Sequence, residues 1–347
     1  MPIRDHIIHL VRGNDLSQEQ AAEAMEEIMT GVATPAQVAA FLTALHLKGE
    51  SDAEIAGMAL IMREKALHVP YDGPVLDTCG TGGDASGTFN ISTTAAFVAA
   101  GAGATVAKHG NRAASSVCGS ADVLEGLGVN IELDGEGVAR CLREAGIGFM
   151  FAQKFHPAMR YVGPVRREIG IRTVFNVLGP LTNPARARHQ VLGVPGPQLA
   201  EKLARALARL DSEHALVVHG DGVDELSLSG ENLVYEVRRG EVRRWPPLRA
   251  ADAGLLAAPR DALRGGDVAE NVAIVRGVLD GAERGPRRDV VLLNAAAALL
   301  AADRAADLRE GLELARASLD SGQARARLDG LVAASRGESR NDNTANR

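Results

Sequence analysis

Aromatic residues are scarce in this sequence: phenylalanine, tryptophan and tyrosine together make up 3% of its 347 residues. Proteins that stack the bases of single-stranded nucleic acid need many such side chains, so this class is disfavoured. An excess of positive charge is also lacking, because the formal net charge is −6. General affinity for a phosphate backbone needs a positive field, and we therefore expect no nucleic-acid partner.

Cysteine and long apolar runs are equally sparse. The three cysteines, Cys79, Cys118 and Cys141, form an odd and widely spaced set that suits neither a disulfide framework nor a zinc site. The longest apolar stretch, 290–302, is too short and too rich in alanine to span a bilayer. Residues 1–10 carry charges and no signal-peptide core. We expect a reduced, cytoplasmic protein without a membrane partner.

The first 70 residues are predicted to be helical. Capping-box patterns begin at Ser17, Thr34 and Ser51, where residue one caps the helix and residue four reaches back. Pro35 stands at a first helical position, where its missing N–H group costs nothing. Apolar residues then recur at helical spacing, which predicts a small helical domain.

Beyond Pro70 the pattern alternates between short buried strands and helices, which predicts an α/β fold with a mostly parallel central sheet. The expected strands of the parallel sheet are 75–76, 104–107, 147–151 and 215–219. The helices expected between them are 95–101, 138–145 and 197–210. An antiparallel meander is expected at 226–228, 233–237 and 242–245. Asp267 begins a further helical region, and 335–347 is expected to be a disordered tail.

A glycine-rich segment, 76–84, precedes a cluster of hydroxyl and amide side chains at the start of a predicted helix. Glycines let backbone N–H groups approach an anion closely, and a helix N-terminus favours phosphate. Residues 76–120 contain eight glycines but only two acidic and two basic residues. The segment therefore indicates an anion site, or else a glycine-rich turn with an N-cap cluster. Its spacing fits neither a dinucleotide fingerprint nor a Walker loop.

A second polar segment, 107–120, leaves a strand and ends at a helix whose expected N-cap is Ser120. Lys108 offers a point charge suited to a phosphate, and neighbouring serine and asparagine side chains add neutral donors. His109 is either a proton carrier or a structural hydrogen-bonding residue; the position beside a glycine turn favours the structural role.

Two charged stretches are further candidate binding sites. Residues 154–188 hold seven basic residues and one acidic residue, which indicates either a site for an anionic ligand or a solvated basic face. Asp224 and Glu225 follow a strand end, where adjacent carboxylates form either a surface turn or a site for a hard cation such as Mg²⁺.

Four motifs in order along the chain resemble the anthranilate phosphoribosyltransferase family: 77–84, 90–94, 108–112 and 176–184. The similarity extends from about Leu16 to beyond Asn294. It implies transfer of the phosphoribosyl group of 5-phosphoribosyl 1-diphosphate (PRPP) to the amine of anthranilate, with inversion at C1′, in tryptophan biosynthesis. It also implies a nucleoside phosphorylase/phosphoribosyltransferase-like fold and two Mg²⁺ ions per subunit.

The resemblance also implies which residues meet each ligand. The metal would lie at Ser92, Asp224 and Glu225, and anthranilate would lie at Gly80, Asn111, His156, Pro157, Arg166 and Pro180, with Arg166 at its carboxylate. The implied PRPP residues are Gly80, Gly82, Gly83, Asp84, Thr88, Asn90, Ile91, Ser92, Thr93, Lys108, His109, Gly110, Asn111, Arg112, Ala113, Ala114, Ser115, Ser116 and Ser120.

By the same resemblance, residues 1–70 and about 164–184 form a helical domain that carries a homodimer interface and part of the anthranilate site. Residues 71–163 and 185–334 then form the α/β domain with the PRPP and Mg²⁺ site. Two related classes serve as alternatives: pyrimidine nucleoside phosphorylases, and a non-enzymatic relative that binds nucleic acid. The basic stretch around Arg160–Arg172 argues against the first, and the negative net charge and intact motifs argue against the second.

Overall fold

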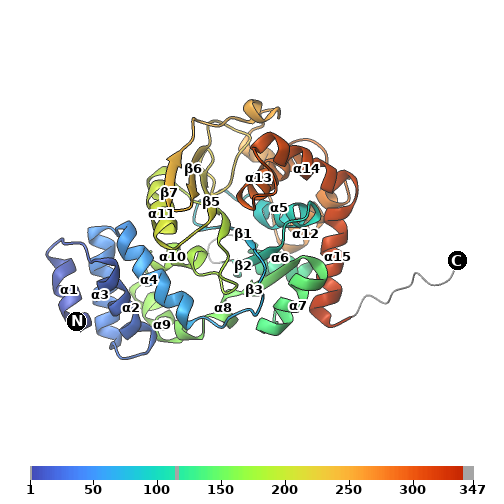
Figure 1. The fold of residues 1–347 in the computed structure, drawn as a ribbon. Helices are drawn as coiled ribbons and strands as arrows, with labels where there is room; N and C mark the ends of the chain where they lie inside the picture. Colours follow the sequence, from blue (N-terminus) through green and yellow to red (C-terminus); the bar gives the residue numbers. More distant parts are fainter. Residues whose placement is uncertain (1, 114–116, 339–347) are drawn as a thin grey trace.

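The computed structural model describes residues 2–113 and 117–338. Four helices form a bundle at the start of the chain (Figure 1): α1 (Ile3–Val11), α2 (Gln18–Met29), α3 (Pro35–Lys48) and α4 (Asp52–Lys65). The capping boxes predicted at Ser17, Thr34 and Ser51 are confirmed, because each hydroxyl accepts the backbone N–H three residues on and the side chain there reaches back. Pro35 occupies the first turn of α3, as predicted.

A seven-stranded sheet forms the centre of the larger part, in the order β3-β2-β1-β4-β5-β6-β7. The strands are β1 (Leu76–Gly80), β2 (Val106–Gly110), β3 (Ile147–Phe151), β4 (His189–Gly193), β5 (His214–His219), β6 (Leu233–Arg238) and β7 (Glu241–Arg244). Strands β1 to β5 pair in parallel, and β6 and β7 continue the sheet antiparallel, which confirms the predicted sheet type. The chain proceeds from β1 to β2 and β3 on one side and then returns to β4 on the other. The direction of winding therefore switches between β1 and β4.

Helices cover both faces of the sheet, and side chains alternate between two cores. Leu216 and Val218 of β5 pack into one core, and Ala215 and Val217 pack into the other. The first core holds α5 (Ile91–Gly101), α6 (Ser120–Gly126), α7 (Gly135–Ala145), α12 (Val268–Leu279), α13 (Pro286–Ala301), α14 (Leu308–Asp320) and α15 (Gln323–Arg336). The second holds α11 (Pro197–Arg209) and extends into the bundle. Two 3₁₀ turns, Ala250–Ala253 and Arg260–Leu263, lie in the connection before α12.

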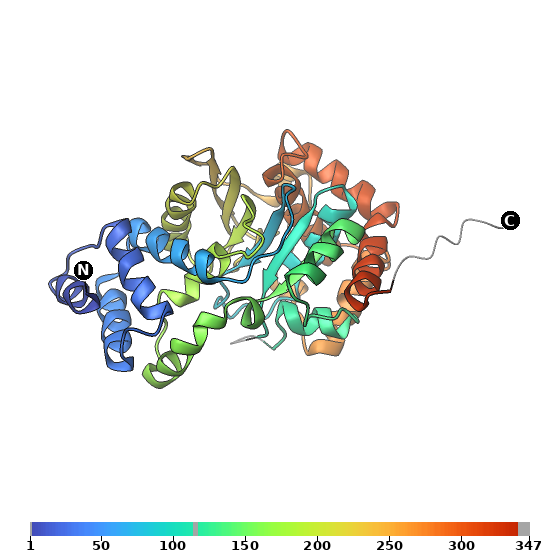
Figure 2. The same cartoon turned by 60° about the horizontal axis from the view of Figure 1, so that its bottom comes forward.

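An insert between β3 and β4 lies beside the bundle, as Figures 1 and 2 show. It contains α8 (Ala152–Phe155), α9 (Gly163–Ile169), α10 (Phe175–Leu178) and the 3₁₀ turns Pro157–Tyr161 and Gly179–Leu181. Helix α9 packs against α3, and α10 packs against α4. Arg63 of α4 donates from Nε to the carbonyl of Leu181 at 2.6 Å. The bundle thus shares one continuous core with the insert and α11 instead of standing as a separate tethered unit.

The structure corrects four local predictions. Strand β4 was not predicted, because its sequence begins with His189 and Gln190 and it becomes a strand through pairing with β1 and β5. Residues 226–228 form no strand, since the backbone N–H of Leu226 binds the Asn294 side chain instead of a neighbouring strand. The N-cap of α6 is Gly119, and Ser120 is its first residue. Helix α15 continues through Arg336 because Ser335, expected in the tail, is buried and receives the Asn130 N–H.

The longest apolar run of the sequence lies inside the protein. Residues 290–301 of α13 are all buried, and the helix packs against α5 and α14. Among the described residues, no helix has the length and apolar character that crossing a bilayer requires.

Candidate active site

The carboxyl ends of the parallel strands bring the predicted motifs to one edge of the sheet. Strands β1, β2 and β4 end at Gly80, Gly110 and Gly193, and β5 ends at His219 shortly before Asp224. In open α/β sheets, ligands bind outside this edge where the winding direction switches. Here that position lies between β1 and β4.

Asp224 occupies this position because two glycines leave room for it. Gly80 and Gly193 are register partners on β1 and β4. A Cβ atom at Gly80 would lie 2.2 Å from Oδ2 of Asp224, and one at Gly193 would lie 1.6 Å from its carbonyl oxygen. Asp224 Oδ2 in turn accepts the backbone N–H of Gly82 at 2.8 Å. The glycine-rich loop is therefore held directly against this carboxylate.

Glu225 and Lys108 meet at the start of α5. The backbone N–H of Ser92 donates to Oε1 of Glu225 at 3.2 Å, and Nζ of Lys108 lies 3.5 Å from Oγ of Ser92. Lys108 Nζ also donates to the carbonyl of Thr78 on β1. Asn90 is the N-cap residue of α5, but its side chain accepts no hydrogen bond from the backbone N–H groups of the first turn. The N-cap side chain therefore leaves these N–H groups available to other acceptors.

The two carboxyl groups are electrostatically unfavourable as ions. Burial raises the pKa of Asp224, and the nearby charge of Asp84 raises it further. Burial also raises the pKa of Glu225, with a further rise from Asp224. Within the described residues, no group of three His, Cys, Asp or Glu side chains is arranged to hold a metal. A cation bound by this pair would take its other ligands from water or from substrate oxygens, as Mg²⁺ does.

The loop after β2 is held by ion pairs at its described ends. Arg112 contacts Asp122 and Glu125, both at 2.9 Å. Oδ2 of Asp122 accepts the backbone N–H groups of Ala113 at 3.0 Å and Gly119 at 2.9 Å. Of the residues predicted for PRPP, Ala114, Ser115 and Ser116 lie outside the described residues.

Two histidines predicted for different substrates lie in contact. The ring centroids of His109 and His156 are 5.0 Å apart. Burial lowers the pKa of His109 to about 3 and that of His156 to about 4, so both are neutral at pH 7. Each has a buried Nε2 atom without a hydrogen-bond partner among the described residues. His109 also bonds the backbone of Gly179, next to Pro180, so the pair adjoins the predicted anthranilate pocket.

Arg166 is a half-buried cation without a counter-ion among the described residues. Its guanidinium carbon lies 5.4 Å from the ring centroid of Phe175. No hydrogen bond or ion pair joins its guanidinium to another described side chain, and burial lowers its pKa. An unpaired, partly desolvated guanidinium is suited to a carboxylate or phosphate ligand.

Two features of this region were not predicted as part of the site. Asn183 Nδ2 donates to Oδ2 of the buried Asp77 at 2.8 Å and to the carbonyl of Ala107 at 2.9 Å, which joins the end of the insert to β1 and β2. Arg172 lies over Gly83 of the glycine-rich loop. Asn183 belongs to the motif at 176–184 and Arg172 to the basic stretch at 154–188, but neither pattern indicates which residue each would contact.

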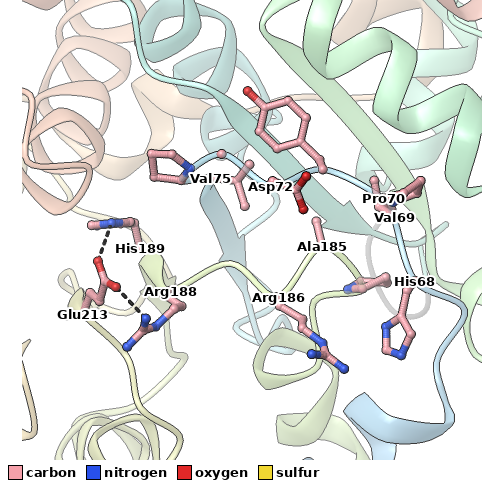
Figure 3. A pocket seen from close by; sticks show the side chains of 14 residues that line it. His68, Val69, Pro70, Asp72, Val75, Ala185, Arg186, Arg188, His189 and Glu213 are labelled. Carbon is pink, nitrogen blue, oxygen red and sulfur yellow. Dashed lines mark ion pairs between the residues drawn. The ribbon is translucent and has the colours of Figure 1, made fainter.

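A separate hollow of about 640 Å³ lies at the opposite edge of the sheet (Figure 3). It is lined by the linker before β1 and by the residues that lead into β4 and β5. Glu213 forms ion pairs there with Arg188 at 2.6 Å and His189 at 3.3 Å. None of the residues predicted to bind substrate or metal lines this hollow.

Comparison with known families matches both parts of the chain. The model for the glycosyl transferase family α/β domain matches residues 72–325, and the model for that family's helical bundle domain matches residues 4–66.

Individual relatives are similar over nearly the whole length. The anthranilate phosphoribosyltransferase of Roseiflexus sp. (strain RS-1) is 75% identical, covering 97% of this chain and 99% of the relative. The crystal structure of the Thermus thermophilus anthranilate phosphoribosyltransferase has a TM-score of 0.90 at 50% identity, covering 96% of this chain and 99% of that one. The Saccharomyces cerevisiae anthranilate phosphoribosyltransferase in complex with PRPP and Mg has a TM-score of 0.88 at 28% identity, covering 96% and 98%.

Proposed function

The chain belongs to the anthranilate phosphoribosyltransferase family, and we propose that its two substrates meet at the carboxyl edge of the sheet, between the glycine-rich loop and the insert. It is an enzyme that transfers the phosphoribosyl group of PRPP to the amine of anthranilate. The products are N-(5-phosphoribosyl)anthranilate and diphosphate, and the step belongs to tryptophan biosynthesis.

PRPP would bind along the glycine-rich loop, the N-terminus of α5 and the loop after β2. The observation that carries this assignment is a chain of contacts between four separate segments: Gly82 and Ser92 donate to the Asp224–Glu225 pair, and Lys108 contacts Ser92. Backbone N–H groups, hydroxyls and one lysine are suited to phosphate oxygens.

Mg²⁺ would bind at Asp224 and Glu225, with Ser92 nearby, and we propose two ions per subunit. The residues fit such ions, because two buried carboxyl groups with raised pKa values lie together and an added cation would favour their charged forms. The yeast relative is known in complex with PRPP and Mg. When bound, Mg²⁺ would neutralise charge on the diphosphate.

Anthranilate would lie against the insert, with its carboxylate at Arg166 and its ring near His156, Pro157 and Pro180. The unpaired guanidinium of Arg166 supports this orientation, and so does the contact between His156 and His109. The two neutral histidines add no positive charge to the pocket at pH 7. Gly80 and Asn111 would contact both substrates.

The protein would lower the barrier by holding the amine in line with the C1′–oxygen bond of PRPP. The amine nitrogen bonds to C1′ as the bond to diphosphate breaks, and the configuration inverts. Lys108 and the backbone of 80–84 would stabilise the charge that grows on the leaving diphosphate. No nucleophilic side chain is required for this displacement.

We further propose a homodimer formed through the helical domain, which would comprise residues 1–70 and about 164–184. The packing of α9 on α3 and of α10 on α4 supports this domain grouping. Exposed apolar side chains on the neighbouring helices α1 and α3, Val11 at 71% and Leu47 at 80% exposed, support an interface there. A cytoplasmic location is supported by the three free, buried cysteines.

The function is tested by following anthranilate fluorescence during incubation with PRPP and Mg²⁺. Consumption of anthranilate that requires both PRPP and Mg²⁺ is expected. Parallel incubations with thymidine plus inorganic phosphate, and a gel-shift titration with DNA, test the two related classes. Phosphorolysis or DNA binding in place of anthranilate consumption would contradict the assignment.

A further inference from the structure

Arg172 of the insert lies directly over the backbone of the glycine-rich loop. Gly83 has a φ of +82°, and a Cβ atom there would lie 2.1 Å from Nη1 of Arg172 and 3.0 Å from both Cζ and Nη2. A side chain at position 83 would therefore be strained and would also displace the guanidinium. The contact joins residues from two distant segments of the chain.

The guanidinium of Arg172 has no counter-ion among the described residues. No ion pair or side-chain hydrogen bond joins it to another described residue, although Asp84 is adjacent to Gly83 in sequence. The Asp84 carboxylate instead accepts the backbone N–H groups of Ser86 at 3.2 Å and Asp224 at 3.3 Å. Within the described part of the chain, Arg172 is therefore exposed and unpaired at the surface of the loop.

Apart from the proposed Mg²⁺ ions, the glycine-rich loop and the loop after β2 offer little free positive charge. Lys108 and Arg112 are the only lysine or arginine residues between 76 and 120. Arg112 is bound to Asp122 and Glu125, and Lys108 is buried against the Thr78 carbonyl. A diphosphate carries several negative charges, and the Asp224–Glu225 pair adds more when it is ionised. The proposed Mg²⁺ ions would offset part of this negative charge, and the free guanidinium of Arg172 would offset more of it at the glycine-rich loop.

We propose that Arg172 binds the diphosphate group of PRPP, both in the substrate and after diphosphate has left C1′. The inference rests on the proposed function and adds one residue to it. The insert then supplies one arginine to each substrate: Arg166 to the anthranilate carboxylate and Arg172 to the diphosphate. A planar guanidinium suits this role because it donates two parallel hydrogen bonds to phosphate oxygens.

The test compares Arg172→Ala with Arg167→Ala, a matched control on the same insert. Arg167 is exposed, and its Nη1 lies 3.6 Å from the Cβ position of Gly163, outside the glycine-rich loop. Initial rates are measured while PRPP and anthranilate are varied separately, and inhibition by added diphosphate is measured against PRPP. Thermal unfolding of each variant verifies that it is folded.

Arg172→Ala is expected to raise the KM for PRPP and the inhibition constant of diphosphate by about ten- to a hundredfold. This is the effect expected from losing one charge-assisted hydrogen bond. The KM for anthranilate should change by less than about twofold. Arg172→Lys should recover part of the loss, and Arg167→Ala should resemble the unmodified protein. An unchanged KM for PRPP, or a rise confined to anthranilate, would overturn the role of Arg172. Failure of the proposed function is distinguishable, because the unmodified protein and Arg167→Ala would then also be inactive.

Discussion

At the residue scale, the carboxyl groups of Asp224 and Glu225 are buried close to each other, and both have raised pKa values. Asp224 fills the space that Gly80 and Gly193 leave at the ends of β1 and β4, and Glu225 reaches the first turn of α5. Lys108 lowers the pKa of Glu225 but does not offset the effects of burial and of Asp224. A bound cation would therefore contribute both to substrate binding and to the stability of this part of the fold.

We expect Asp224→Ala combined with Glu225→Ala to reduce activity and to shift the Mg²⁺ requirement to higher concentration. The diphosphate would lose the carboxylates that anchor its counter-ion. Activity measured across a Mg²⁺ titration, at fixed PRPP and anthranilate, provides the readout. A double variant with the Mg²⁺ dependence of the unmodified protein would remove the metal assignment.

The same pair predicts a pH dependence of stability in the metal-free protein. Both folded-state pKa values are raised, so the folded state binds more protons than the unfolded state between the ordinary carboxyl pKa and the raised values of about 7 and 8. This stabilisation is present at acidic pH and is lost as pH rises through that window. The free energy of unfolding should therefore fall across this window, and the fall should be smaller in the double variant.

Arg166, like Arg172, is a residue whose substitution should affect the KM of one substrate more than that of the other. Arg166→Ala should raise the KM for anthranilate far more than that for PRPP, with a loss in kcat/KM of about ten- to a hundredfold. Arg166→Lys should restore little, because lysine offers a point charge where the carboxylate needs a planar pair of donors. Steady-state kinetics with each substrate varied provide the measurement. Equal effects on both KM values would mean that the carboxylate pocket lies elsewhere.

At the scale of elements, Asn183 connects the insert to the strands that carry the PRPP residues. Its amide donates to Asp77 of β1 and to the Ala107 carbonyl of β2, and its Oδ1 accepts the N–H of Ala185 at 2.9 Å. All these groups are buried or partly buried. The backbone of Gly179 adjoins His109 of β2 a few residues earlier. The insert is therefore positioned against β2 by polar contacts as well as by apolar packing.

We expect Asn183→Asp to destabilise the protein by about 2–4 kcal/mol, because it would place a second carboxylate against the buried Asp77. Adding Asp77→Asn exchanges donor and acceptor and should recover part of the loss. Urea unfolding of both single variants and the double variant gives the coupling energy. Equal stability of Asn183→Asp and the unmodified protein would show that this bond does not hold the insert.

At the scale of the whole molecule, the helical bundle has a packed side and an exposed side. Its inner face shares a core with the insert and α11, while its outer face leaves Ile8, Val11 and Leu47 exposed at 41%, 71% and 80%. The proposed dimer through α1 and α3 would cover these side chains. In a symmetric dimer each substitution acts on both subunits.

Sedimentation at micromolar concentration is expected to show a dimer, and Leu47→Glu should shift it toward monomer. Burying a leucine is worth about 2 kcal/mol, and a glutamate there would add the cost of desolvating a charge. Leu256→Glu is the matched control, because Leu256 is 82% exposed on the α/β part. A monomeric unmodified protein, or equal effects of the two substitutions, would contradict an interface on α1 and α3.

Features that depend on near neighbours could be predicted from the amino-acid sequence. The starts of α2, α3 and α4 follow from contacts between residues three apart, such as the bond from the Gln20 N–H to Ser17. Strand β3 has the predicted bounds, because five buried residues follow the glycine that ends α7. The glycine-rich loop and the hydroxyl cluster at α5 were likewise visible as patterns, since backbone access and helix-end donors are local properties.

Features that join distant segments of the chain depend on the three-dimensional fold. Strand β4 contains His189 and Gln190 and forms because β1 and β5 supply its hydrogen bonds. The contacts of Asp224 with the glycine-rich loop, of Asn183 with Asp77 and of Arg172 with Gly83 each cross about 90 residues or more. Sequence patterns placed most of these residues in motifs or charged stretches but did not indicate what they contact. Their partners depend on the strand order, which brings the strand ends to one edge of the sheet.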